Sequence, residues 1–292
     1  MAAPETQQTC FVSGTSGYLG SRIKSALQRR GWRVVELTRR PSSGSKAVQF
    51  QLGTDLPSST LAGAHALVHC AYDFTPLSWP NIHRVNVAGS ERLLRAAHEA
   101  GVENLIYISS ISAFEGCRSL YGRAKLATER AVQPLGATVI RPGLIWGELP
   151  GAMFKRLVDQ VEHARMLPLL GGGSQIQHLV HEQDLVGLIC GWAERSALRG
   201  VPITIAHEQP WTLRQILEEI ARANGKRMSF LPVPWRLVWL ITKTAELCGV
   251  RLPFRSDSVI SLMNQNPTPS FAPQRDLNLV CRPFRMEKPP GC

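Results

Sequence analysis

The feature that most restricts the fold of this chain is the alternation of apolar and amphipathic segments along its first half. Short runs rich in β-branched and aromatic residues alternate with longer segments whose apolar residues recur at helical spacing. The expected strands are residues 9–14, 32–38, 47–53, 66–72, 104–110 and 137–143, and the expected helices are 19–31, 90–101 and 121–136. Buried strands that alternate with helices are typical of a parallel sheet covered on both faces. Right-handed crossovers make such a sheet doubly wound, so we predict a doubly wound parallel α/β fold.

The pattern loosens after Gly147. We expect a first domain of residues 1–147 and a smaller α/β lobe of residues 148–292, with some segments of the second half returning to the first sheet. The proline-rich tail from Asn266 is expected to be irregular. In the second half, the expected helices are 153–166, 184–196 and 212–225, and the expected strand is 201–208.

One long apolar segment, residues 230–250, needs separate treatment. It is interrupted by two prolines and by Arg236 and Lys243, so it is too broken for a membrane span. It contains Trp235 and Trp239 at helical spacing. We expect it to pack as a core helix; the alternative is a helix that lies on a membrane surface or docks a partner.

Three glycines, Gly14, Gly17 and Gly20, stand three residues apart between the first expected strand and the first expected helix. In such a unit, glycines allow a tight turn, close approach of backbone to a pyrophosphate and close packing of helix on strand. The helix N-terminus adds unpaired N–H groups and a partial positive charge. The sequence therefore predicts a Rossmann domain that binds a dinucleotide; the alternative is a glycine-rich turn in another α/β fold.

The end of the second strand discriminates between the two nicotinamide cofactors. An NAD site usually has an acidic residue there for the ribose 2′-hydroxyl, whereas an NADP site often has Arg. Here Thr38 stands in that place and is followed by Arg39 and Arg40, while Glu36 lies within the strand. An Arg beside an uncharged Thr suits a 2′-phosphate. We expect NADP, with NAD as second choice; the alternative is that both arginines only face solvent.

A candidate acid–base pair lies in the helix expected at 121–136. Tyr121 and Lys125 are four residues apart, so they share one face of that helix. A tyrosine ordinarily titrates near pH ~10, and a nearby ammonium favours its phenolate. Such a phenol can exchange a proton with a carbinol–carbonyl pair while a nicotinamide exchanges hydride. The pair also follows Ser109 and Ser110 at the end of the fifth strand.

In these segments the chain resembles the short-chain dehydrogenase/reductase superfamily, and in particular its extended, NAD-dependent epimerase/dehydratase branch. The resemblance is carried by GTSGYLG, HCAY, NVAGSERLLRAAHEAGVENLIYISS, YGRAK, RPGLIWG and QHLVHEQDL, and by PWTLRQILEEIARANGKRMSFLPVP nearer the C-terminus. It implies an NAD(P)-dependent enzyme with a Rossmann domain and a substrate-binding lobe.

The resemblance also implies roles for individual residues. Tyr121 would be the general acid and base, and Lys125 would bind the nicotinamide ribose and lower the pKa of the tyrosine. Ser110 would hydrogen-bond the substrate oxygen, with Ser109 and Ser112 as alternatives. The implied cofactor-binding residues are Gly14, Ser16, Gly17, Tyr18, Leu19, Gly20, Arg39, Ala71, Asn86, Tyr121 and Lys125.

Other parts of the resemblance concern the substrate. Residues 141–143, Arg-Pro-Gly, would pass the nicotinamide edge and lead into the substrate lobe. His178 and His181 fall in a strand that usually faces this lobe; a structural role for each is the alternative. The segment between Ser110 and Tyr121 is short for the extended branch, and no N-P-Y-G-like stretch follows the sixth strand. Both departures argue against a sugar-nucleotide substrate.

Charge and cysteine content bear on partners and location. The chain has 33 Lys and Arg against 22 Asp and Glu, a net charge of +11, which favours anionic partners. Nucleic acid is not expected, because no basic–aromatic tract, zinc-finger or RNP-like signature occurs. The seven widely spaced cysteines include no C-x-x-C, which indicates reduced thiols, no metal site and a cytoplasmic protein. The N-terminus has no signal-peptide pattern.

Three functions are compatible with the sequence. The first is an NAD(P)-dependent oxidoreductase acting on a carbonyl or alcohol group of a small molecule through the Ser/Tyr/Lys set. The second is a nucleotide-sugar epimerase or dehydratase that retains NAD, for which Arg214, Arg251 and Arg255 are candidate diphosphate ligands. The third is a non-catalytic NADP-binding sensor or accessory subunit, which has no need of that set. A homodimer is expected from the resemblance alone.

Overall fold

The computed structural model describes residues 7–41, 44, 46–147, 152–195, 200–250, 252 and 254–286. The chain divides into two compact units that interleave along the sequence. The first unit comprises Met1–Ser110, Ala124–Arg141 and Glu182–Thr204, and the second comprises Ile111–Arg123, Pro142–His181 and Ile205–Cys292. The domain boundary expected at residue 147 stays a prediction.

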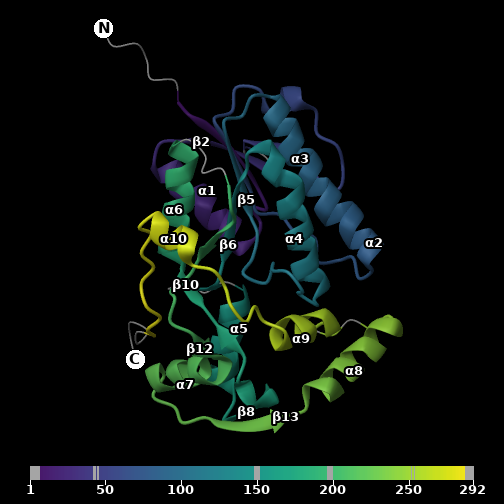
Figure 1. The fold of residues 1–292 in the computed structure, drawn as a ribbon, viewed down its shortest axis with the longest axis vertical. Coiled ribbons are helices and arrows are strands. Elements are labelled where there is room, and N and C mark those ends of the chain that lie inside the picture. Colours follow the sequence, from purple (N-terminus) through teal and green to yellow (C-terminus); the bar gives the residue numbers. More distant parts are fainter. Residues whose placement is uncertain are drawn as a thin grey trace. The chain divides into compact units, whose positions relative to one another are not determined.

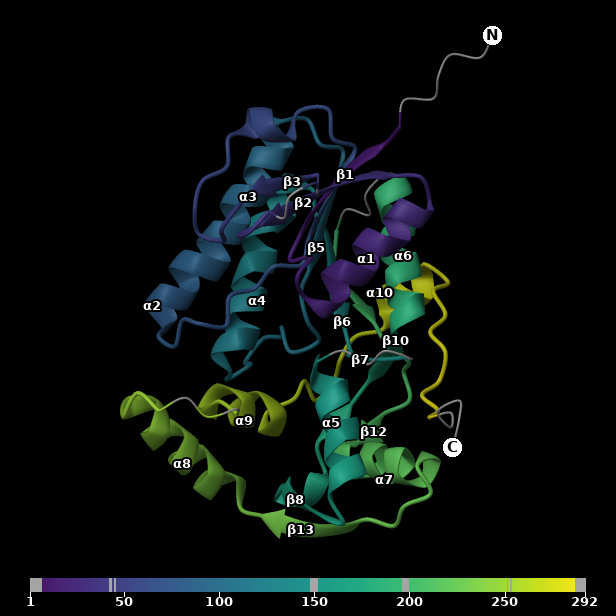
Figure 2. The ribbon, with the colours of Figure 1, turned by 180° about the vertical axis from the view of Figure 1, so that it is seen from behind.

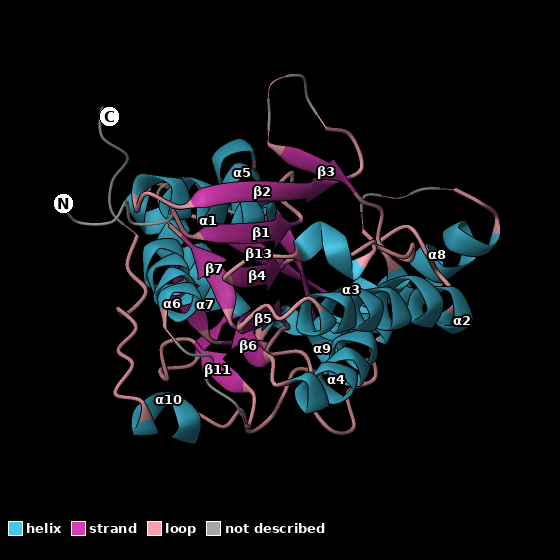
Figure 3. Cartoon of the chain, turned by 90° about the horizontal axis from the view of Figure 1, so that it is seen from above, coloured by secondary structure: helices cyan, strands magenta, loops and turns pink. Residues whose placement is uncertain are grey.

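The first unit is built on a seven-stranded sheet with the order β11-β6-β5-β4-β1-β2-β3 (Figure 3). Neighbouring strands from β3 through β6 pair in parallel, for example Phe11 with Val35 on one side and Leu67 on the other. The order reverses between β1 and β4, as in a doubly wound dinucleotide-binding sheet. The strands are β1 (Thr9–Ser13), β2 (Arg33–Thr38), β3 (Ala47–Gln49), β4 (Ala66–His69), β5 (Asn104–Ile108), β6 (Thr138–Pro142) and β11 (Ile203–Ile205).

Helices cover both faces of this sheet (Figure 1). Helices α1 and α6 pack against each other on one face, and α3 and α4 lie on the other face. The bounds are α1 (Tyr18–Arg29), η1 (Ser58–Leu61), α2 (Trp79–Ile82), the π-helical η2 (His83–Val87), α3 (Ala88–Glu99), α4 (Leu120–Val132), η3 (Gln133–Leu135) and α6 (Glu182–Glu194). The predicted doubly wound α/β fold is therefore confirmed.

Burial explains why these segments form central strands. Every residue of β4 and of β5 is buried, as expected for strands with a helix on each face. Leu93 and Leu94 of α3 join a buried cluster with Phe11, Leu67 and Leu105 from the strands beneath. Fully burying such a side chain contributes about 1.5–3 kcal/mol. The apolar stripe of α3 therefore packs on the continuous apolar strands, and each surface buries the other.

Among its described residues, the second unit contains three two-stranded sheets, with pairs β7 and β10, β8 and β13, and β9 and β12. Its core gathers aromatic rings around Phe284, which makes edge contacts with Trp146, Phe154 and Trp211. The bounds are β7 (Leu144–Trp146), α5 (Ala152–His163), β8 (Met166–Leu170), η4 (Gly171–Gly173), β9 (Ile176–Gln177), β10 (Leu179–His181), β12 (Trp211–Thr212), α7 (Leu213–Ala223) and β13 (Ser229–Val233).

One expectation about the C-terminal part is wrong. The segment expected to pack as a core helix forms α8 (Trp235–Leu247), in which only Thr242 is buried. The tail beyond Asn266 is irregular over most of its described residues, as expected, but it contains the short helix α10 (Ala272–Asp276) and buries Phe284. Helix α9 (Ser256–Met263) lies beside α8 in both ribbon views (Figure 2).

Candidate active site

A pocket of about 270 Å³ opens at the carboxyl ends of β1, β2, β3 and β4. This is the place where the strand order reverses and where doubly wound sheets bind their ligands. Four short segments line it: Gly14–Gly17, Leu37–Arg39, Phe50–Leu52 and Cys70–Phe74. The glycine loop, Arg39 and Ala71 therefore converge on one pocket, although the sequence separates them widely.

Glycine is required at two positions of the loop. Gly14 has φ +75°, and a Cβ on it would lie 2.8 Å from the backbone nitrogen of Ala71. A Cβ on Gly20 would overlap the carbonyl oxygen of Gly14, so α1 packs directly on the turn. A larger residue at either position would push apart the backbone that forms the pocket wall.

The N-terminus of α1 provides donors to an anion. The helix begins at Tyr18 after Gly17, and within the described residues no side chain caps it. Its first-turn N–H groups, which have no intrahelical acceptors, include those of Tyr18, Leu19 and Gly20. Bare backbone, positive helix polarity and a pocket beside the loop fit a pyrophosphate.

The end of β2 is basic. Glu36, the strand's acidic residue, binds the ammonium of Lys24 at 2.5 Å. Burial raises the pKa of this carboxyl and the ammonium of Lys24 lowers it, and the net shift of the pKa is downward. Arg39 lines the pocket and is exposed, and no carboxylate pairs with it within the described residues. The guanidinium is therefore the charged group that β2 presents to the pocket.

A buried histidine ties β1 to β4 under the pocket. The Ser13 hydroxyl accepts the N–H groups of Cys70 and Ala71, at 3.2 and 3.3 Å. Its proton is then donated to His69 Nδ1 at 2.6 Å, and His69 Nε2–H donates to the hydroxyl of Ser90 at 2.8 Å. Burial lowers the pKa of His69 to about 3, with the charge of Lys125 adding to the effect. The ring is therefore neutral, and this network fixes the turn at Ala71.

Asn86 fixes a second wall of the pocket. It lies in the π-helical segment η2, where it is buried. Its side-chain oxygen accepts the N–H of Asp73 at 2.7 Å, and its amide donates to the carbonyl of Asp73 at 2.9 Å. One side chain thus satisfies both backbone groups of a pocket residue, and π-helical insertions frequently occur at functional sites.

Tyr121 is half-buried in the first turn of α4. The carboxylate of Asp257, at the start of α9, accepts the N–H of Leu120 at 2.6 Å and that of Tyr121 at 3.1 Å. A residue more than a hundred positions away thus caps the helix that carries Tyr121. Sequence reasoning missed Asp257, and no local pattern could have found it.

Lys125 follows one turn later in α4 and is buried. Its ammonium donates to the carbonyl of Ile108 at 2.7 Å, and it lies 4.9 Å and 5.3 Å from the ring centres of Tyr107 and Tyr72. Burial lowers its pKa to about 8. Carbonyl and aromatic contacts stabilise a charge that would otherwise be costly to bury.

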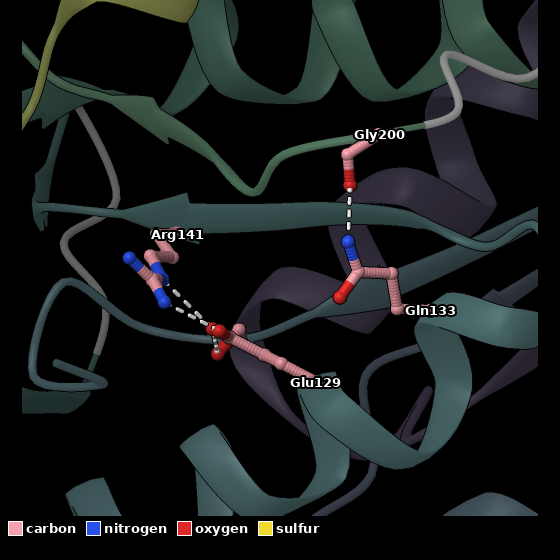
Figure 4. Close-up of polar contacts among 5 residues, drawn as sticks. Glu129, Gln133, Arg141 and Gly200 are labelled. Atoms are coloured by element: carbon pink, nitrogen blue, oxygen red, sulfur yellow. Dashed lines mark hydrogen bonds and ion pairs between the residues drawn. The ribbon is translucent and has the colours of Figure 1, made fainter. Parts of the chain in front are cut away.

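The serines at the end of β5 differ in their contacts. Ser109 is buried, and its hydroxyl donates to Glu129 of α4. Arg141 binds the same carboxylate through two nitrogens, at 2.9 and 2.5 Å (Figure 4). Ser110, directly after Ser109, is less buried. The Glu129 carboxylate therefore accepts hydrogen bonds from both Ser109 and Arg141. The sequence did not predict either contact.

The predicted residues Gly143, His178 and His181 lie in the second unit, whereas Arg251, a predicted diphosphate ligand, lies outside the described residues. A Cβ on Gly143 would overlap the carbonyl oxygen of His178, so β7 and β10 approach closely there. The His178 ring Nδ1–H donates to the carbonyl of His207 at 3.3 Å. His181 is buried with its ring edge-on to Trp146, 4.5 Å between centres. Both histidines thus have structural contacts.

Two further features bear on the chemistry. Among the described residues, no group of three or more His, Cys, Asp or Glu side chains is arranged to hold a metal ion. None of the helices in the described part of the chain is long and apolar enough to cross a lipid bilayer.

Comparison with known proteins agrees with this geometry. The model of the NAD dependent epimerase/dehydratase family matches residues 10–202. Ceramide reductase of Caulobacter vibrioides (strain NA1000 / CB15N) is 27% identical over 289 residues, which cover 94% of this chain and 90% of the reductase. The 4-hydroxy-2-methyl-3-oxo-4-farnesyl-3,4-dihydroquinoline-1-oxide ketoreductase of Stigmatella aurantiaca is 30% identical over 256 residues, 77% of this chain and 76% of that enzyme. The crystal structure of gox2253 has the same fold, with a TM-score of 0.71 at 20% identity, covering 95% of this chain and 94% of gox2253.

Proposed function

Because the chain belongs to the NAD-dependent epimerase/dehydratase family and is an NAD(P)-dependent enzyme, we propose that it interconverts a carbonyl and an alcohol group on a lipophilic small molecule with NADP(H). The observation that carries the cofactor choice is Arg39, which lines the pocket directly after Thr38, the residue that stands where an NAD-binding acid would be. Glu36 supports this choice, since Lys24 already holds its carboxylate.

The chemistry rests on the Ser/Tyr/Lys set. A bound nicotinamide would supply or accept the hydride. Tyr121 would donate a proton to the carbonyl oxygen in reduction and accept it in oxidation. Lys125, one turn along the same helix, would favour the phenolate, and Ser110 would donate a hydrogen bond to the substrate oxygen. Ser109 is the weaker candidate for that last role, because its hydroxyl already donates to Glu129.

The lipophilic substrate class is supported by the named relatives. Ceramide is a lipid, and the ketoreductase acts on a farnesylated ring. The chain matches both enzymes over more than two thirds of its length. The short segment between Ser110 and Tyr121 also leaves little chain to cover a nucleotide sugar.

An epimerase or dehydratase is the second candidate, because the matching family includes such enzymes. Such an enzyme keeps its cofactor through the cycle, whereas a reductase exchanges it. Mass spectrometry of the denatured protein after purification distinguishes the two. We expect an empty protein that oxidises added NADPH in the presence of long-chain ketones; stoichiometric retained NAD would contradict the reductase.

The cofactor preference is tested by Arg39→Ala. We expect the Kd for NADPH to rise about tenfold or more, because a charge-assisted bond to the 2′-phosphate is lost, while the Kd for NADH changes little. Fluorescence titration with both nucleotides measures the two constants. Arg95→Ala, which removes an equal charge on α3, is the matched control. Equal weakening for both nucleotides would rule out the NADP preference.

A further inference from the structure

Helix α8 directs four large apolar side chains outward. Leu237, Leu240, Ile241 and Leu247 are between 53% and 77% exposed, whereas Thr242, a polar residue, is buried. At 100° per residue, Leu237, Leu240 and Leu247 fall on one stripe of the helix. The helix therefore carries a second apolar side, which faces solvent, opposite the half-buried side that contains Trp235, Val238 and Trp239.

The exposed apolar surface continues beyond the helix. Val250 and Leu252, which follow α8, are 53% and 40% exposed. We call the six side chains the α8 face: Leu237, Leu240, Ile241, Leu247, Val250 and Leu252. Single exposed apolar residues are common, but six within sixteen residues form an exposed apolar surface typical of sites that bind a protein or a membrane.

The edge of the α8 face is basic. Arg236 and Lys243 are exposed and seven residues apart, so they lie on one flank of the stripe. The one acidic residue of α8, Glu246, accepts the backbone N–H of Ser256 at 2.8 Å and its hydroxyl at 2.7 Å. Its charge is thus used at the start of α9, and positive charge dominates beside the apolar stripe.

An apolar stripe with a cationic flank matches the surface of an anionic bilayer. Apolar side chains enter the boundary between headgroups and acyl chains, and basic residues remain at the phosphates. We propose that the α8 face docks on an anionic lipid surface, with α8 lying in the plane of the membrane.

Docking would connect the membrane to the proposed chemistry. Glu246 of α8 binds Ser256, and the next residue, Asp257, caps the helix of Tyr121. The docked helix is therefore joined to the α4 N-terminus by two successive capping contacts. This connection to a lipophilic substrate rests on the proposed function; docking itself rests on exposure and charge.

Vesicle flotation without cofactor or substrate tests the docking. The wild type is expected to float with phosphatidylcholine vesicles containing roughly one third phosphatidylserine, and much less with pure phosphatidylcholine. The double variant Arg236→Gln/Lys243→Gln should bind about 25-fold more weakly, since each basic residue near such a surface contributes about fivefold. Leu240→Glu/Ile241→Glu should abolish flotation.

Val280→Glu is the control, because it places a negative charge on a highly exposed apolar residue outside the α8 face. It should float as the wild type does, and circular dichroism confirms that every variant folds. Absence of flotation on anionic vesicles would overturn the proposal. So would a dimer in solution that Leu240→Glu/Ile241→Glu dissociates, since the face would then bind a second copy. NADPH turnover in detergent tests the proposed function separately.

Discussion

Tyr18 and Tyr121 both lie in the first turn of a helix, but their surroundings give them different chemistry. The hydroxyl of Tyr18 donates to Glu182, and burial together with that carboxylate raises the pKa of the phenol. Arg22 pairs with the same carboxylate at 3.6 Å. The phenol of Tyr18 therefore joins α1 to α6. The part of Tyr18 that could contact a cofactor is its backbone N–H group. Tyr121 precedes the buried ammonium of Lys125 by one turn.

Tyr121→Phe separates catalysis from binding. We expect turnover to fall about 10²- to 10⁴-fold, because no other phenol on α4 can transfer the proton. The affinity for NADPH should stay within about twofold, since the pocket residues are unchanged. Steady-state rates and fluorescence titration on the same preparation measure both. Retained turnover would show that Tyr121 is not the acid.

His69 gives stability a definite pH dependence. The unfolded chain binds a proton at this histidine below about pH 6.5, whereas the buried ring stays neutral down to about pH 3. The contribution of His69 to the free energy of unfolding is therefore fully present above about pH 6.5 and is lost as the pH falls toward 3. From about pH 7 to about pH 5 this residue alone should cost about 2 kcal/mol.

Urea unfolding at both pH values checks this prediction in the wild type and in His69→Gln. The variant should be less stable at neutral pH by about 1–3 kcal/mol, because Ser13 and Ser90 lose their buried partner, and it should lose less on acidification. His98→Gln, at an exposed site on α3, is the control. An identical pH dependence in wild type and His69→Gln would contradict the neutral buried ring.

At the scale of elements, α4 depends on α9 for its first turn. Asp257→Ala removes the acceptor of two N–H groups, so we expect a loss of about 0.5–2 kcal/mol in stability. Displacement of Tyr121 should also lower kcat about tenfold, with KM nearly unchanged. Asp257→Asn retains one of the two oxygen acceptors, so it should restore only part of both. An Asp257→Ala enzyme with normal kcat would remove any positioning role.

Sequence patterns predicted elements well where local signal and burial agree. The strands of the first unit and helices α1, α3 and α4 were expected near their observed positions because each carries a clear period. The segment of α8 was correctly expected to form a helix, but it was wrongly expected to pack in the core. An apolar segment favours removal from water, but its sequence does not indicate whether protein or a lipid surface covers it.

At the scale of the whole molecule, the sequence predicted the doubly wound sheet because alternating strands and helices admit few topologies. It did not predict that Phe284, near the C-terminus, would lie among Trp146, Phe154 and Trp211. Such packing joins residues more than seventy positions apart, and no local pattern encodes it.

The candidate site divides in the same way. The glycine loop, Arg39 and the Tyr121–Lys125 pair follow from short motifs, because their chemistry needs fixed local spacing. Glu129 and Asp257 were not predicted, because each acts across the fold on a partner that only the tertiary structure identifies. The roles of the predicted site residues stay predictions.

The most direct test of the central claim is a crystal structure of the protein with NADP⁺. The account predicts the pyrophosphate against the backbone of Gly14–Leu19, the 2′-phosphate on Arg39, and the nicotinamide beside the hydroxyl of Tyr121. A glycine loop without nucleotide at saturating NADP⁺, or a nicotinamide far from that hydroxyl, would contradict it.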